Sequence, residues 1–243
     1  MSFDEVWTAV AGVEGWMTRN QGRVLYDAAH DCPPGGRIVE IGSFRGRSTI
    51  VLASAAPEGA TIVAIDPHAG NDRGPEEISG YVDAAESDHA AFLANLEAAG
   101  LSGRVTHLRM FSDAALAAID GAVDVLYVDG AHRYGPARAD IRDWGRRVAP
   151  GGTLLIHDSF SSVGVTLAIL RQLTFGRPFR YVGRSRSLAT YRADLRGNRV
   201  GNASRQIAQL PWFVKNVSLK VLLKLGGGRV LARLGRSVPE WPY

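Results

Sequence analysis

Five short apolar runs, separated by stretches with helical periodicity, constrain the fold of this 243-residue chain more than any other feature. The runs are rich in Ile, Val and Leu, and they cover residues 37–41, 61–65, 104–108, 123–128 and 153–156. The stretches 46–57, 83–99, 112–119 and 134–149 between them have the spacing of crossover helices. Near-continuous apolar strands are typical of a parallel sheet covered by helices on both faces.

The two ends of this alternating region complete the predicted sheet. Apolar residues at three- and four-residue steps predict helical structure over residues 1–30, which ends at the helix-breaking segment 32–36. Residues 179–182 and 187–191 flank the polar turn 183–186 and predict a closing hairpin. The sequence therefore predicts a Rossmann-like α/β fold: a doubly wound, mostly parallel, seven-stranded sheet with helices on both faces.

Charge divides the chain into two parts. Residues 171–243 carry fifteen Lys and Arg against two acids, whereas the first 170 residues carry thirteen against twenty-two. The stretch 211–225 has the pattern of a basic amphipathic helix, which could cap the core, pack against a second subunit in a homodimer, or lie on a membrane surface. The few aromatic residues of this region form no stacking motif, so nucleic acid is not an expected partner.

Two further features bear on the compartment. No run is long and apolar enough for a membrane span, and the N-terminus lacks the layout of a signal peptide, so we expect a cytoplasmic protein. The single cysteine, Cys32, excludes an internal disulfide and a cysteine-based zinc cluster.

A glycine turn follows the first predicted strand, at the sheet edge where doubly wound folds bind their ligands. Residues 40–46 read Glu-Ile-Gly-Ser-Phe-Arg-Gly. Gly42 permits a sharp turn close to a ligand, and Gly46 permits close packing at the start of the next helix. The Gly-x-x-x-Gly spacing differs from the dinucleotide fingerprint, which disfavours a nicotinamide cofactor.

The next two strand ends carry polar residues. Asp66 lies twenty residues beyond Gly46, where a carboxylate can bind both hydroxyls of a ribose, although an Asp-Pro turn is the simpler alternative. Ser112 and Asp113 follow the third strand and could contact the cofactor or cap the following helix.

The fourth and fifth strands each end in an acid and a histidine. Asp129 is followed by His132, and His157 by Asp158. If the two strands are neighbours, the carboxylates project above the same sheet edge, where they would repel each other unless a divalent cation lies between them. Such a cation would orient a substrate hydroxyl and lower its pKa, so that a nearby base could take the proton.

These motifs together resemble the class I S-adenosylmethionine-dependent methyltransferases. They are Glu-x-Gly-x-x-x-Gly at 40–46, the acid at 66, Asp-Gly-x-His-x-Tyr at 129–134, and Pro-Gly-Gly at 150–152 with an acid after the strand. More narrowly, the chain resembles the metal-dependent sugar O-methyltransferases that act on macrolide sugars and related glycosides. The resemblance covers about residues 36–192, and it implies S-adenosylmethionine and magnesium as cofactors.

The resemblance also implies roles for individual residues. Asp129 and Asp158 would bind the metal. His132 and Asp129 would be the catalytic residues, with His132 as the general base. The alternative for His132 is a partly buried histidine bonded to backbone, which is the commoner role of a lone histidine. The expected cofactor-binding residues are Glu40, Gly42, Ser43, Gly46, Ser48, Asp66, Ser112, Asp113 and Asp129. The sugar enzymes have Glu-Asp where this chain has His157-Asp158, so the third metal ligand could be His157, Ser159 or water, or it could be absent. A histidine ligand would favour manganese or another transition metal over magnesium.

Domain limits and acceptor follow from the same resemblance. We expect a methyltransferase domain over residues 1–192, including its N-terminal helical segment, and a basic amphipathic extension over 193–243. The polar loop 68–81 favours an oligosaccharide or other sugar acceptor. The Ala-, Gly- and Arg-rich composition suggests a high-GC organism, and the chain resembles the mycobacterial enzymes that act on methylmannose polysaccharide precursors, which implies a mannoside of polysaccharide biosynthesis as acceptor. The alternatives are a catechol-type small-molecule O-methyltransferase and a non-catalytic cofactor-binding protein whose basic tail docks on lipid or on a partner.

Overall fold

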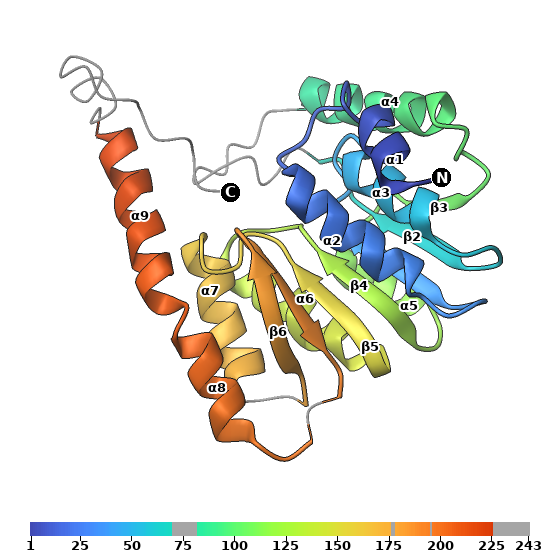
Figure 1. Ribbon diagram of the computed structural model, residues 1–243. Helices are drawn as coiled ribbons and strands as arrows, with labels where there is room; N and C mark the ends of the chain where they lie inside the picture. The colour runs from blue at the N-terminus through green and yellow to red at the C-terminus, as the bar shows by residue number, and fades with distance from the viewer. Residues whose placement is uncertain (70–81, 176–177, 195, 226–243) are drawn as a thin grey trace.

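The predicted doubly wound sheet is confirmed in the computed structural model, which describes residues 1–69, 82–175, 178–194 and 196–225. The strands are β1 (Arg37–Ile41), β2 (Thr61–Ile65), β3 (Val105–Leu108), β4 (Val123–Val128), β5 (Val148–Ile156), β6 (Arg180–Ser185) and β7 (Leu188–Arg192). They form a seven-stranded sheet of order β3-β2-β1-β4-β5-β7-β6 (Figure 1). The β6–β7 hairpin is antiparallel to the five-stranded parallel part.

The strand order creates a switch point between β1 and β4. The chain leaves β1 for β2 and β3 on one side and then returns to place β4 on the other side of β1. Glu40 of β1 is paired in register with Ala64 of β2 and with Tyr127 of β4. The loops after β1 and β4 therefore diverge at the carboxyl edge of the sheet, where ligands of such folds bind.

Two helical layers cover the sheet. The helices are α1 (Phe3–Ala9), α2 (Arg19–His30), α3 (Arg47–Ala55), α4 (Val82–Ala98), α5 (Ser112–Ala118), α6 (Tyr134–Asp143), α7 (Val163–Ile169), α8 (Arg199–Ile207) and α9 (Leu210–Lys224). Residues of α1 to α4 form one buried cluster with Ile38, Ala64 and Val125. Residues of α5 to α7 form a second cluster on the other face, with Val39 and Leu126.

Several predicted boundaries were wrong, for local physical reasons. The helical segment predicted over 1–30 is two helices, because Thr18 and Gln21 form a capping box that starts α2 anew. The helix predicted over 134–149 ends at Asp143 and continues only as a short 3-10 turn, Trp144–Arg146, because residues from Val148 already pair in β5. The hairpin turn is also shorter than predicted, because β6 continues to Ser185 and β7 begins at Leu188.

The sequence did not predict α7 and α8, whereas α9 matches the predicted helix at 211–225 within a residue. A π-helical turn, Leu170–Thr174, follows α7 directly. Of the helices in the described ranges, none combines the length and the apolar character that a membrane span requires.

Candidate active site

The turn after β1 is shaped by its glycines. Gly42 has φ of 88°, and a Cβ atom there would lie 2.3 Å from the carbonyl oxygen of Asp129. The Gly42 N–H donates to the Ile65 carbonyl at 2.8 Å, and the Asp129 N–H donates to the Ile41 carbonyl at 2.8 Å. The turn is therefore clamped between the ends of β2 and β4, and only glycine fits at position 42.

Ser43 in this turn has a polar group that the protein does not satisfy. Its side chain is buried, and its hydroxyl has no hydrogen-bond partner among the described residues. Next to it, Gly46 precedes α3 as N-cap with φ of 87°, so no side chain caps the first amides of that helix. A buried hydroxyl without a partner costs free energy unless a ligand supplies one, which fits a polar cofactor at this turn.

Asp66 ties the ends of β1 and β2 together. One carboxylate oxygen accepts the Phe44 N–H at 2.8 Å, and the other accepts the His68 N–H at 2.8 Å. The side chain remains 17% exposed at the sheet edge. A carboxylate oxygen has more than one lone pair, so Asp66 can hold the turn and still accept a hydroxyl hydrogen bond.

Glu40 and Ser48, both predicted to bind the cofactor, are bonded to each other. The hydroxyls of Ser48 and Thr49 donate to the two oxygens of the Glu40 carboxyl group. Burial raises the pKa of Glu40 to about 8, despite these hydrogen bonds. Glu40 is almost completely enclosed, so in this arrangement it supports the turn from beneath; its contact with a cofactor stays a prediction.

Ser112 and Asp113 lie at the start of α5. The Ser112 hydroxyl donates to Asp140, whose pKa burial raises to about 6. Asp113 is exposed and accepts the Ala114 N–H at 2.8 Å. The alternative that either residue is the N-cap was wrong, because the N-cap is Phe111 and its side chain makes no capping bond.

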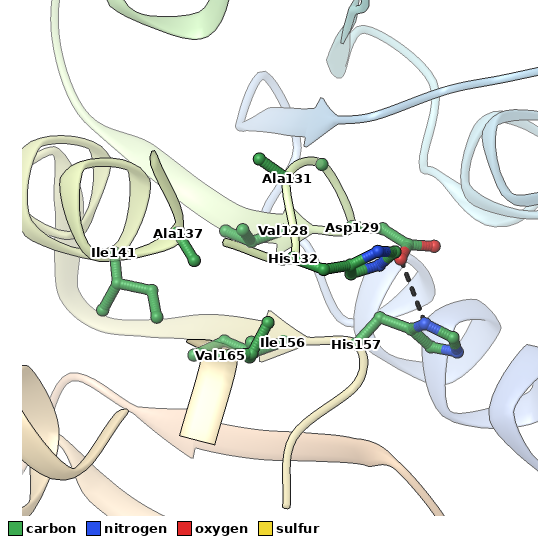
Figure 2. Close-up of a pocket in the computed structure, with 10 residues that line it drawn as sticks. Val128, Asp129, Ala131, His132, Ala137, Ile141, Ile156, His157 and Val165 are labelled. Carbon is green, nitrogen blue, oxygen red and sulfur yellow. Dashed lines mark ion pairs between the residues drawn. The ribbon is translucent and has the colours of Figure 1, made fainter. Parts of the chain in front are cut away.

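The ends of β4 and β5 bring the predicted acids and histidines together. His157 Nδ1 lies 3.0 Å from Asp129 Oδ1 and 3.8 Å from Asp158 Oδ2 (Figure 2). The other Asp129 oxygen accepts the Tyr127 hydroxyl at 2.7 Å. His157 is 4% exposed, so it is a buried partner shared by both carboxylates.

His132 forms a second pair at the same edge. Its Nε2 atom lies 2.9 Å from Asp158 Oδ2, while its side chain remains 39% exposed. The Asp158 side chain is 14% exposed. His132 is therefore the member of this group that a molecule entering from solvent can reach.

The charges of these groups support one another. Burial works against a charge on His157, but Asp129 outweighs it and raises the pKa of His157 to about 9. Burial likewise works against a charge on Asp158, yet the hydrogen bond from His132 and the charge of His157 hold the pKa of Asp158 well below its usual range. At pH 7 the geometry thus favours an imidazolium at 157 and a carboxylate at 158.

A small hollow of about 10 Å³, roughly the room of one water molecule, lies between the ends of β4 and β5 and the helices α6 and α7. Asp129, His132 and His157 lie toward one side of it, as Figure 2 shows. Apolar side chains of the helices, including Ile141 and Val165, line another part. The two histidines therefore lie beside an apolar wall, in a space that is smaller than an acceptor molecule.

Two sequence comparisons found similar proteins, and one of them points to an activity class. Residues 39–159, which include the glycine turn and both histidine-acid pairs, match a family model described as a methyltransferase domain. A curated relative, the uncharacterized protein y4gI of Sinorhizobium fredii (strain NBRC 101917 / NGR234), is 29% identical over 129 residues, or 51% of this chain. The match covers 13% of that relative, so the chain spans only a small part of its length.

Solved structures share the fold of this chain. Cofactor-bound Rv0187 from MTB has a TM-score of 0.56 at 17% identity, covering 79% of this chain and 89% of that chain. An O-methyltransferase from Bacillus cereus, in complex with SAH, has a TM-score of 0.51 at 17% identity, covering 78% and 87%. TomG from Streptomyces achromogenes, an O-methyltransferase in complex with SAM, has a TM-score of 0.51 at 17% identity, covering 78% and 86%. The chain has the Rossmann-like methyltransferase fold.

The turn after β5 holds two residues in the left-handed region of backbone conformation. Asp158 and Phe160 have φ of 52° and 55°, which non-glycine residues rarely adopt. The turn is held by Ser159, whose N–H donates to the Ser187 carbonyl at 2.8 Å, and by Asn216 of α9, which donates to the Phe160 carbonyl at 3.3 Å. Such strain persists where the surroundings determine the backbone, as they do here.

Sequence reasoning missed three residues that build the site. Tyr127 orients Asp129, and Asn216 holds the turn after β5 from a helix 56 residues away. A Cβ at Gly164 would lie 2.2 Å from the His132 carbonyl oxygen, so this glycine lets α7 approach the His132 loop. Only Tyr127 could have been found in the sequence, because it is two residues from Asp129 and points to the same face of β4.

The predicted metal ligands lie together but do not fit a divalent ion in this arrangement. His157 Nδ1 is directed at Asp129 with its proton, so it donates where a ligand nitrogen would have to accept. In the described ranges, no group of three or more His, Cys, Asp or Glu side chains is disposed to hold a metal ion. The polar loop predicted to grip sugar hydroxyls lies, from residue 70 to 81, outside those ranges.

Proposed function

We propose that this protein is an S-adenosylmethionine-dependent O-methyltransferase that acts on a hydroxyl group of a sugar or glycoside. The observation that carries the proposal is the exposed His132 paired with Asp158 beside a glycine turn that has an unsatisfied buried hydroxyl. The methyltransferase-domain match over residues 39–159 supports it, as do relatives of the same fold that bind SAM or SAH.

The glycine turn is the proposed cofactor site. Gly42 lets the backbone come close to the ligand, Ser43 offers its hydroxyl, and Asp66 offers a carboxylate to the ribose hydroxyls. Bound there, S-adenosylmethionine supplies an electrophilic methyl group, and the protein has to hold an acceptor oxygen in line with it.

His132 is the proposed general base. As the new oxygen–methyl bond forms, the hydroxyl proton passes to the His132 imidazole, and S-adenosylhomocysteine leaves with the electron pair of the broken sulfur–carbon bond. Asp158, 2.9 Å from His132 Nε2, stabilises the imidazolium that results. His157 keeps Asp158 ionised and Asp129 in place, so the base keeps its orientation.

Metal assistance, which the resemblance to sugar O-methyltransferases implies, stays a prediction. Asp129 and Asp158 are the residues that would hold magnesium or manganese, with His157 as third ligand, if His157 gave up its present hydrogen bond. Because His157 already lies between the two carboxylates and offsets part of their charge, the reaction proposed here includes no step through a metal.

The test is a methyl-transfer screen with S-adenosylmethionine carrying a labelled methyl group. Acceptors are simple sugars, mannosides and other glycosides, and catechols, each with EDTA and with added magnesium or manganese. We expect an O-methyl product from a sugar or glycoside in both metal conditions. Transfer only to catechols would overturn the acceptor class. Loss of activity in EDTA that either metal restores would establish the metal-assisted form instead.

A further inference from the structure

The end of the described chain is uniformly basic. Within the described residues 196–225 the sequence contains six Lys and Arg and no acid. This stretch includes α8 and α9, which Figure 1 shows along one side of the molecule, with α9 next to α7. A surface built from it attracts an anionic partner.

Helix α9 has an unpartnered apolar face. Val214, Val221, Leu222 and Leu225, here called the α9 stripe, are 59%, 51%, 45% and 81% exposed. At about 100° per residue, Val214, Val221 and Leu225 lie within about 20° of one line along the helix. Lys215 is exposed about 100° around the helix from this line, so positive charge lies at the border of the aliphatic face.

The opposite face of α9 holds the helix to the fold. Asn216 donates to the Phe160 carbonyl at 3.3 Å, and Lys220 donates to the Ser161 carbonyl at 3.1 Å. Nearer its start, Trp212 and Phe213 pack against the core cluster of α5 to α7. Among the described residues, the α9 stripe therefore takes no part in anchoring the helix, and no described side chain covers it.

We propose that the α9 stripe docks on an anionic lipid bilayer, with α9 lying in the plane of the interface. The stripe is aliphatic, whereas protein–protein interfaces are enriched in aromatic residues, Met and Arg, none of which it contains. Aliphatic residues flanked by Lys are typical of helices at the boundary between headgroups and acyl chains. Since no described helix can span a bilayer, the contact is a surface contact.

The docked orientation has a consequence for the active site. The inner face of α9 contacts Phe160 and Ser161, which follow Asp158 in the strained turn. A chain docked through the α9 stripe therefore has α9 between this turn and the bilayer.

The test is vesicle flotation of the full chain. Vesicles contain phosphatidylcholine alone or phosphatidylcholine with phosphatidylglycerol. The wild type is compared with the double variant Val221→Glu, Leu225→Glu and with Leu93→Glu, an exposed leucine of α4 that controls for the added charge. All the substituted side chains are exposed, so unfolding midpoints should remain unchanged. We expect binding to the anionic vesicles only, reduced at least tenfold in the double variant and unchanged in Leu93→Glu.

Three results would overturn the proposal. Equal flotation of the wild type and the double variant would place the lipid contact elsewhere. Equal binding to neutral vesicles would remove the anionic requirement. Absence of flotation, measured together with sedimentation of the chain, would assign the stripe to another occupant: a second copy if the double variant converts a dimer to a monomer, or the chain's own residues 226–243 if the wild type is already monomeric.

Discussion

The turn after β1 and the paired ends of β4 and β5 lie at the same edge of the sheet, but they are built differently. The geometry of the turn is set by backbone contacts: position 42 has no room for a Cβ, and Asp66 accepts hydrogen bonds from two backbone N–H groups. The geometry at the ends of β4 and β5 is set by side-chain pairs: His132 is paired with Asp158, and His157 with Asp129. The difference suggests that the first region provides a shape for the cofactor, whereas the second provides charges for the chemistry.

Removing the base should have the largest effect on turnover. We expect His132→Ala to lower kcat by about 10²- to 10⁴-fold, because general-base catalysis contributes that much. Affinity for S-adenosylhomocysteine should stay the same, since His132 is not in the glycine turn. Steady-state kinetics and calorimetry check the two parts separately, and an unchanged kcat would assign the base to another group.

A glycine series tests the backbone-built region. Gly42→Ala should lower the free energy of unfolding by about 2–5 kcal/mol and abolish measurable cofactor binding, because its Cβ clashes with the Asp129 carbonyl in a left-handed conformation. Gly35→Ala is the matched control: it has φ of 72° but nothing within 4 Å, so it reports the strain alone. If urea unfolding shows the same loss of unfolding free energy in both variants, a Cβ at position 42 does not clash with the Asp129 carbonyl.

The pH dependence of stability tests the charge-built region. The folded pKa of His157 is about 9, above the usual value near 6.5, so its stabilisation is fully present below about pH 6.5 and is lost as pH rises through 9. Between these limits the wild type should lose about 3 kcal/mol of unfolding free energy relative to His157→Gln. The exposed His30→Gln variant should follow the wild type. A parallel pH profile for His157→Gln would show that His157 is neutral in the fold.

Ser43→Ala should have the smallest effect. Loss of one hydrogen bond to the cofactor corresponds to about 0.5–1.5 kcal/mol, or roughly a two- to tenfold weaker affinity for S-adenosylhomocysteine. Stability should not fall, because the hydroxyl has no partner among the described residues. In Ser48→Ala, by contrast, the loss of the bond to Glu40 should lower stability. The opposite pattern would exchange the roles of the two serines.

The parallel sheet and its site edge were predictable because both depend on local pattern. Apolar runs such as 123–128 allow little besides buried strands, and the topology then carries Asp129 and Asp158 to one edge. The pairing of side chains was not predictable. Whether His157 faces a metal or a carboxylate depends on the side-chain conformation, the Tyr127 bond and the burial, and spacing encodes none of these.

The C-terminal region shows the same limit. The pattern at 211–225 predicted α9 but left open what its two faces contact. The bond from Asn216 to Phe160 joins residues 56 apart, and it depends on how α8 and α9 pack after the hairpin. No periodicity of the sequence contains that information.

The central claim is that the turn after β1 binds the cofactor and the ends of β4 and β5 carry out the chemistry. Its most direct test measures S-adenosylhomocysteine affinity and labelled methyl transfer for Gly42→Ala and for His132→Ala. We predict that Gly42→Ala loses affinity, and transfer with it, whereas His132→Ala keeps the wild-type affinity and loses transfer alone. If His132→Ala loses both together, or transfers methyl groups at the wild-type rate, the cofactor site and the chemical site are not separated as proposed.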